Sequence, residues 1–208
     1  MGVQERKQRE KVYREESILA AAKKVFLEKG LVVATMDDIA TEAELGKGTL
    51  YRHYRSKEDI LLAINEQAVR EVHQQYLKAV AGAGSGLEKI LRLTRTYYAF
   101  VAANPVYFGF IAFFESPFTS TDAAAVYETT KAINVLVMEL IELGKQDGSL
   151  RTDLKTNLVA STIWATSCGI MQFVVSKGHH LVQDHHISLD ELFETFLSTL
   201  ASGIQAPK

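Results

Sequence analysis

The architecture of this chain follows from one stretch, Thr35-Met-Asp-Asp-Ile-Ala-Thr-Glu-Ala-Glu-Leu-Gly-Lys-Gly-Thr-Leu-Tyr-Arg-His-Tyr-Arg-Ser-Lys57. Thr35 stands where a helix N-cap is expected, and Asp38 three residues later completes a capping box. A tight turn at Leu45-Gly46 then separates this first short helix from a second one over residues 47–54. Because two short helices joined in this way cross steeply, the stretch predicts a helix-turn-helix motif.

The second helix of the motif carries side chains suited to double-stranded DNA. It buries Leu50 on its inner face, and a major groove about 12 Å wide accepts a helix from its outer face. We expect Thr49 to contact a base edge or a thymine methyl group and Arg52 to bond to guanine. The other candidates contribute phosphate-binding side chains or helix N-terminal amides: Lys47, Gly48, Tyr51, His53 and Lys57.

The rest of the chain is predicted to be all-α. Apolar residues recur at helical spacing almost throughout, and only three prolines occur in 208 residues. A first helix is expected over residues 15–28 with Gly30 as its C-cap, preceded by a flexible basic arm at 1–13. An arm that reads the minor groove of DNA is the alternative for this basic segment. Ser56 is expected to cap a fourth helix that continues towards Val80.

A glycine-rich linker, Gly82-Ala-Gly-Ser-Gly86, separates these helices from the remainder of the chain. Beyond it the pattern predicts helices near residues 86–103, 105–115, 122–147, 155–177 and 188–204. The expected organisation is a DNA-binding domain at 1–56 and a helical ligand-binding and dimerisation domain at 57–208, with about nine helices in all.

Charge is distributed unevenly between these parts. Residues 1–57 hold twelve Lys and Arg against nine Asp and Glu, which gives a charge of +3. Because the net charge of the chain is −2, the remaining residues carry −5. A basic head on an acidic body fits a polyanion-binding domain and disfavours a protein that coats nucleic acid non-specifically. The single cysteine, Cys168, and the charged N-terminus predict a cytoplasmic protein without a membrane segment.

The helix-turn-helix stretch resembles the TetR family of bacterial regulators over roughly residues 14–66. The matching positions are Thr35, Ala40, Gly48-Thr49-Leu50-Tyr51, His53 and Ser56-Lys57-Glu58. The resemblance implies a homodimeric transcription regulator that contacts operator DNA through Thr35, Lys47, Thr49, Tyr51, Arg52, His53 and Lys57. Many members carry serine where this chain has Gly46, so backbone amides must replace that hydroxyl here.

Aromatic residues concentrate in one segment of the second domain. Nine of them lie between Tyr97 and Phe118, spread over more than one helix face, which fits either a two-sided core or an apolar pocket. The family resemblance places the ligand cavity in this region. The predicted pocket for a small, largely apolar effector consists of Phe100, Tyr107, Phe110, Phe114, Tyr127 and Trp164.

The last two predicted helices carry more apolar residues than one bundle face needs, and the resemblance puts a four-helix dimer interface there. The predicted interface residues are Leu158, Met171, Phe193, Phe196, Leu197 and Leu200.

No catalytic constellation and no cofactor motif is present in the sequence, so we expect neither enzymatic activity nor a cofactor. Four histidines between His179 and His186 match no metal-site spacing, and no metal is predicted. The expected function is a repressor released from its operator by an effector. An activator or global regulator with the same DNA-binding head, and a helical ligand-carrier that does not bind DNA, remain as alternatives.

Overall fold

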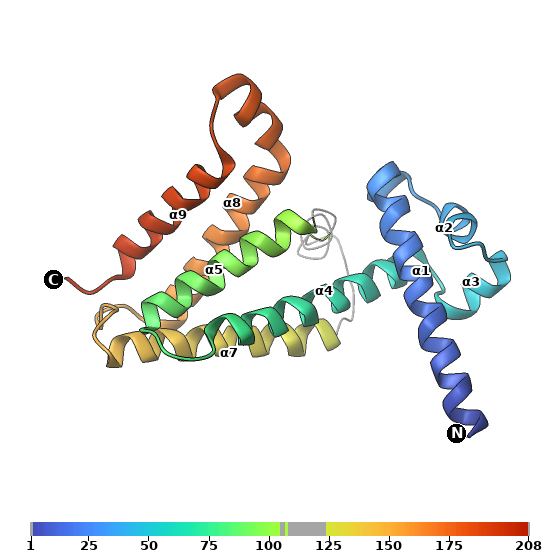
Figure 1. Ribbon diagram of the computed structural model, residues 1–208, viewed down its shortest axis with the longest axis horizontal. Coiled ribbons are helices and arrows are strands. Elements are labelled where there is room, and N and C mark those ends of the chain that lie inside the picture. Colours follow the sequence, from blue (N-terminus) through green and yellow to red (C-terminus); the bar gives the residue numbers. More distant parts are fainter. Residues whose placement is uncertain (1, 105–106, 108–123, 208) are drawn as a thin grey trace. The chain divides into compact units, whose positions relative to one another are not determined.

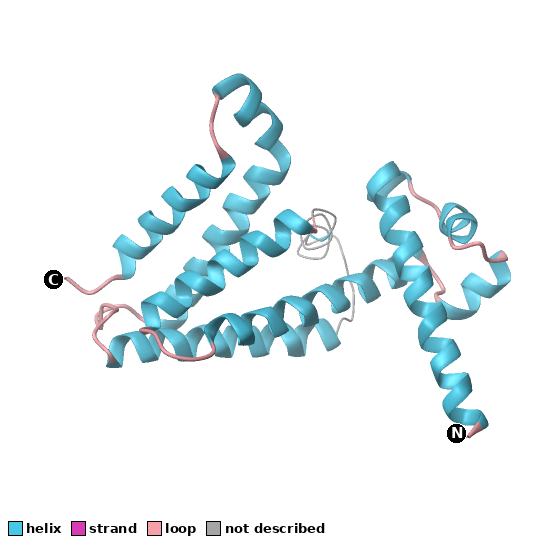
Figure 2. Cartoon of the chain, in the orientation of Figure 1, coloured by secondary structure: helices cyan, strands magenta, loops and turns pink. Residues whose placement is uncertain are grey.

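A computed structural model describes residues 2–104, 107 and 124–207 of the chain, and every regular element within these residues is a helix (Figures 1 and 2). The only strand-like pairing there is an isolated antiparallel bridge between Leu150 and Gln205. The helices are α1 (Val3–Val33), α2 (Met36–Glu42), α3 (Lys47–His53), α4 (Lys57–Val80), α5 (Gly86–Ala103), α7 (Ala124–Gln146), α8 (Thr156–His185) and α9 (Leu189–Ile204). The predicted all-α class with an N-terminal helix-turn-helix is confirmed.

Most predicted boundaries agree with the structure because local caps define them. Ser85 accepts a hydrogen bond from the Glu88 amide at the start of α5, and Ser188 accepts one from the Glu191 amide at the start of α9. Ser56 does the same for the Asp59 amide at the start of α4. The predicted helix at 105–115 lies outside the described residues.

Two helices are longer than predicted. α1 begins at Val3 instead of near Glu15, because the segment expected to be a flexible arm is helical and carries ion pairs at i, i+4 spacing, such as Arg6–Glu10. α8 continues to His185, so three of the four histidines expected in a loop lie on its last turns. At the other end of α1 the backbone departs from helical geometry at Gly30, whose φ of 77° favours glycine, as the C-cap prediction required.

The described residues fall into two compact units, divided inside α4 after Ala68. The first contains α1, α2, α3 and the start of α4, and its core is built from Ile18, Ala22, Val25, Ile39, Leu50, Ile60, Leu61 and Ile64. The division lies beyond the predicted domain boundary at residue 56, because the first turns of α4 contribute core residues to this unit.

The second unit is built around a close crossing of α5 and α7. A Cβ added to Gly86 would lie 2.2 Å from the backbone nitrogen of Gly144, so only glycine allows the two helices to approach this closely. The turn after α7 completes the crossing: the Asp147 carboxylate accepts a hydrogen bond from the Gly86 amide at 2.7 Å, and Ser149 Oγ accepts one from the Leu87 amide. The polar turn therefore satisfies the first amides of α5.

The chain end is attached to the same turn. The Arg151 amide donates to the Ile204 carbonyl at 3.0 Å, and the Ala206 amide donates to the Ser149 carbonyl at 3.1 Å. The residues before α8 and the residues after α9 are thus bonded to each other, which closes the open end of the hairpin that these two helices form.

Candidate functional site

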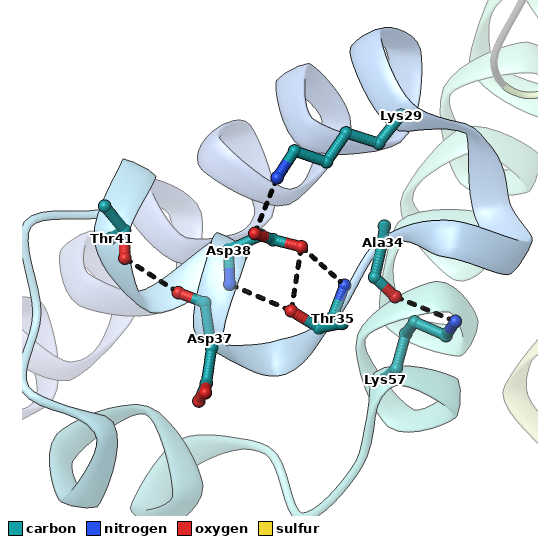
Figure 3. A network of polar contacts seen from close by, with 7 residues as sticks. All are labelled: Lys29, Ala34, Thr35, Asp37, Asp38, Thr41 and Lys57. Carbon is teal, nitrogen blue, oxygen red and sulfur yellow. Dashed lines mark hydrogen bonds and ion pairs between the residues drawn. The ribbon is translucent and has the colours of Figure 1, made fainter.

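The helix-turn-helix is fixed by a polar network at the start of α2 (Figure 3). Thr35 Oγ1 accepts a hydrogen bond from the Asp38 amide, and the Asp38 carboxylate accepts one from the Thr35 amide, which completes the predicted capping box. Lys29 of α1 donates to the same carboxylate at 2.6 Å. Hydrogen bonds from Lys29 and then from Thr35 lower the pKa of Asp38 to about 2.

The turn between α2 and α3 depends on a residue that the sequence did not single out. Glu44 has a φ of 53°, in the left-handed region, and the Leu45 amide after it donates to the Ala40 carbonyl at 2.9 Å. α3 then begins after Gly46, whose extended backbone provides no side-chain cap. The amides at the start of α3 therefore have no hydroxyl partner of the kind that a serine would supply.

The outer face of α3 is open. Tyr51 is 49% exposed, Arg52 is exposed, and a Cβ added to Gly48 would meet no atom within 4 Å. Thr49 is half-buried beside them, while Leu50 is fully buried and attaches the helix to the core. Four of the predicted DNA contacts, Gly48, Thr49, Tyr51 and Arg52, thus lie on the same short helix beside the buried Leu50.

Two of the predicted DNA contacts lie beside acidic side chains within this unit. Lys47 Nζ lies 2.6 Å from the Asp37 carboxylate of α2, and this hydrogen bond raises the pKa of the lysine. The His53 ring lies 3.6 Å from Glu15 of α1 and is only 13% exposed. Sequence spacing gave no signal for either pair, since their members belong to different helices.

Lys57 occupies a different position from the one expected of a phosphate contact. Its ammonium group donates to the backbone carbonyls of Leu31 at 2.8 Å, Val32 at 3.2 Å and Ala34 at 2.9 Å, the last of which is drawn in Figure 3. A lysine has three N–H donors, so these carbonyls occupy all of them. The first residue of α4 therefore holds the end of α1, and a phosphate would have to replace one of these bonds.

The predicted ligand-pocket residues are only partly brought together. Phe100 and Tyr107 are buried and stack with ring centroids 5.5 Å apart. Trp164 lies 6.0 Å from the ring of Tyr97 but remains part-exposed, and Tyr127 is 66% exposed on α7. Phe110 and Phe114 lie outside the described residues.

Polar side chains of α5 and α8 are also buried in the second unit. The Tyr97 hydroxyl lies 3.8 Å from Cys168 Sγ. The neighbouring Ser167 is buried, and its Oγ has no hydrogen-bond partner among the described residues. A buried hydroxyl of this kind is available to a polar group of a bound molecule.

The predicted dimer residues divide into two sets. Met171, Phe193 and Leu197 are buried in the protomer's own core and are not presented to a partner. Leu158, which is 58% exposed, lines an open groove of about 920 Å³ between α8 and α9 together with Phe196 and Leu200. Apolar periodicity alone did not separate the inward from the outward side of these helices.

The apolar character of α8 also satisfies the length and composition of a membrane span, contrary to the prediction that no segment would. One such helix is weak evidence of a span, because core helices pass the same test. In the part of the chain that the structure describes, no three His, Cys, Asp or Glu side chains are grouped as metal ligands. His180 instead lies 3.0 Å from Asp184, one turn away on α8.

Comparison with known proteins gives one match confined to the DNA-binding unit and others that extend over most of the chain. Residues 18–64 match the family described as bacterial regulatory proteins, tetR family. The transcriptional repressor KstR2 of Rhodococcus jostii is 25% identical over 202 residues, which cover 93% of this chain and 92% of that protein.

Solved structures with the same fold include the ketosteroid transcriptional regulator KstR2 of Mycobacterium tuberculosis, with a TM-score of 0.69, 21% identity and coverage of 93% of this chain and 96% of that one. The transcriptional regulator FadR of Bacillus subtilis, solved in complex with stearoyl-CoA, has a TM-score of 0.74 and 20% identity, with coverage of 91% and 98%. With its open α3 surface, its capped helix-turn-helix and these matches, the chain is a DNA-binding transcription regulator, and its residues 18–64 match the tetR family of bacterial regulatory proteins.

Proposed function

We propose that this protein is a homodimeric repressor that leaves its operator when a largely apolar effector binds to the helical body. The observation that carries the proposal is the outer face of α3, where Tyr51 and Arg52 are exposed and Gly48 leaves the helix backbone open. Arg52 has no ion-pair partner among the described residues, so its guanidinium is available to a guanine base. We assign Thr49 to the neighbouring base position.

The remaining predicted DNA contacts have different roles in this proposal. Tyr51 and Lys47 bind phosphates, with Lys47 exchanging its exposed Asp37 partner for DNA at little cost. Thr35 and His53 border the same surface. Lys57 holds the end of α1 in place and acts on DNA binding through the position of the helix-turn-helix.

The groove between α8 and α9 is the proposed dimer interface. Leu158, Phe196 and Leu200 form an apolar surface that a second copy would cover, which also accounts for the exposed apolar residues of α8. Two-fold symmetry of the dimer then requires a near-palindromic operator with half-sites spaced by whole turns of DNA, roughly 34 Å or a multiple. The site of action is the cytoplasm, and no catalytic step is proposed.

The effector is proposed to be an acyl-CoA or a molecule with a comparable apolar body. The buried Phe100–Tyr107 pair supplies an aromatic surface, and the unpartnered Ser167 hydroxyl supplies one polar contact. Stearoyl-CoA in the B. subtilis regulator is an acyl chain joined to a polar group, and it is therefore the first probe.

α4 is the proposed coupling element because its residues belong to both units of the molecule. We take α4 to have two arrangements, one of which binds DNA better. An effector that binds the other arrangement more tightly lowers the affinity for DNA, at most by the ratio of its own affinities for the two arrangements. Coupling of about 1–3 kcal/mol is typical, and it must act equally in both directions.

The test measures both directions of this coupling. Gel-shift titration of the promoter beside the protein's own gene, with and without excess random DNA, measures specific binding. Trp164 is the only tryptophan in the chain, so its fluorescence follows stearoyl-CoA binding with and without operator, with free coenzyme A as control. Weaker operator binding with ligand and equally weaker ligand binding with operator are expected.

Equal ligand affinity in both conditions would contradict effector release. Ligand binding without any DNA binding would favour the ligand-carrier alternative. A reporter gene under the identified operator shows the sign of regulation. Deletion of a repressor raises reporter expression, whereas deletion of an activator lowers it.

A further inference from the structure

The first turns of α1 lie outside the core of the DNA-binding unit. Every described side chain from Gln4 to Arg14 is exposed, whereas Ile18, four residues after Arg14, is fully buried. Figure 1 shows this part of α1 continuing as helix beyond the end that is covered by α2 and α3. A helix that extends past its own core needs a reason other than packing.

Basic residues lie in line along this exposed part of α1. Lys7, Lys11 and Arg14 follow the spacing i, i+4, i+7, which places them on one face of a helix. The same face continues eleven residues after Lys7 with the buried Ile18 and then with Val25. The three basic residues, called here the basic stripe, therefore lie on the side of α1 that packs against the rest of the unit further along.

The acidic residues of this segment are arranged differently. At 100° per residue, Glu5 and Glu16 lie on the side of α1 opposite to Lys7. Arg6 is off the stripe and paired with Glu10 at 2.9 Å, and Arg9 Nε donates to the Glu5 carbonyl. Glu10 and Glu15 border the basic residues, one on each side, and Glu15 pairs with Lys11 at 3.7 Å. The sector between these two glutamates holds only Lys7, Lys11 and Arg14 among the charged residues of this segment.

A contact between α1 and α3 fixes where the basic stripe begins. Glu15 lies 3.6 Å from His53, the last residue of α3, and 3.7 Å from Lys11 on the stripe. The stripe therefore runs away from the C-terminal end of α3. With α3 in a major groove, the surface beyond that end faces the phosphate backbone that borders the groove.

We propose that the basic stripe, Lys7, Lys11 and Arg14, binds phosphates of operator DNA next to the groove entered by α3. The inference rests on the proposed function and extends its footprint by a contact that carries no base specificity. Lys7 and Arg14 are 10.5 Å apart along the helix at about 1.5 Å per residue, so the stripe spans more than one phosphate.

The experiment compares two variants that each lose two positive charges from the same helix. Lys7→Gln/Arg14→Gln removes both ends of the stripe, and Arg6→Gln/Arg9→Gln removes the two arginines that are off it. Operator binding by the full-length protein is measured by fluorescence anisotropy over a range of salt concentrations. Circular dichroism confirms that both variants keep their helix content.

The stripe variant is expected to reduce the slope of log affinity against log salt by about 0.9 for each lost phosphate contact, about 1.8 per protomer. Its preference for operator over random DNA is expected to stay the same. The control variant is expected to change the slope by less than a third of that amount. Equal changes in the two variants, or none in either, would overturn the proposal.

Binding of the wild-type protein to DNA and to vesicles decides what the basic stripe contacts. A wild-type protein that binds no DNA contradicts the proposed function itself, whereas wild-type binding with an unchanged stripe variant contradicts only the role of the stripe. Sedimentation with vesicles of phosphatidylserine and phosphatidylcholine tests a membrane as the partner. Vesicle binding that is lost in the stripe variant, with an unchanged DNA salt slope, would overturn the assignment to DNA.

Discussion

The helices inside each of the two units are positioned by different kinds of interaction. In the DNA-binding unit, short helices are positioned by polar groups at their ends: Thr35 and Asp38 cap α2, and Lys57 caps the end of α1. In the body, long helices are positioned by apolar layers and by the glycine crossing of α5 and α7. Substitutions of similar size should therefore change stability and binding by different amounts in the two units. The following experiments test that difference.

The largest effect is expected at the glycine crossing. In Gly86→Ala the new methyl group would meet the Gly144 backbone, which cannot move like a flexible side chain, so unfolding should be easier by about 3 kcal/mol or more. The matched variant Gly48→Ala adds a methyl group to an open helix position, where it should stabilise by up to about 1 kcal/mol. Urea denaturation measures both, and equal stability changes would contradict the distinction between the units.

The next largest effect is expected on the outer surface of the body. Leu158→Arg places a charge in the groove between α8 and α9, so dimers should dissociate and operator affinity should fall by about thirtyfold or more, as for a loss of about 2 kcal/mol. Val135→Arg, on an exposed apolar position of α7, is the control. Sedimentation velocity follows the oligomeric state, and a dimeric Leu158→Arg protein would count against the proposed interface.

A smaller effect is expected at Lys57. Lys57→Met leaves three carbonyl groups at the end of α1 without their donor, so the DNA-binding unit should lose about 1–3 kcal/mol of stability. Operator affinity should fall while its salt dependence stays the same, because no phosphate contact is lost. Lys47→Met should leave the stability nearly unchanged and make the salt dependence of operator binding flatter, because it removes a phosphate contact. A flatter salt dependence in Lys57→Met would restore this lysine as a phosphate contact.

The smallest effect concerns pH. The pKa of Asp38 is held at about 2, below its ordinary value near 4, so its carboxylate stabilises the folded state. This contribution is complete above pH 4 and is lost as the pH falls towards 2. The stability difference between the wild type and Asp38→Asn, measured by denaturant unfolding at several pH values, should therefore shrink between pH 4 and pH 2. A constant difference would contradict the role of this carboxylate.

The sequence predicted the elements that depend on neighbouring residues. The caps at Thr35, Ser85 and Ser188 and the break at Gly30 depend on residues within one turn, and the structure has each of them. The extent of α8 was missed: Gly178, a residue type that often follows the end of a helix, comes directly after residue 177, but the helix continues through it and ends before the left-handed His186.

The parts that the sequence did not predict depend on distant residues. Lys57 matches a phosphate-binding position in the sequence, but its carbonyl partners lie more than twenty residues earlier in the chain. Likewise, Met171 and Leu158 are both apolar residues of α8, and the packing of α8 against α5, α7 and α9 determines that one is buried and the other exposed. Helical periodicity identifies an apolar face but not what covers it.

The attachment of the chain end to the turn after α7 has a consequence for association. Because Leu150 pairs with Gln205 and the Ala206 amide bonds to Ser149, the hairpin of α8 and α9 is a closed loop whose ends cannot separate freely. Its outer surface is then preorganised, and less conformational entropy is lost when a partner covers it. If a second copy covers this surface as proposed, fraying of the last residues is thermodynamically linked to dissociation of the dimer. Amide hydrogen exchange at Arg151 and Ala206 should accelerate when the protein is diluted towards monomers.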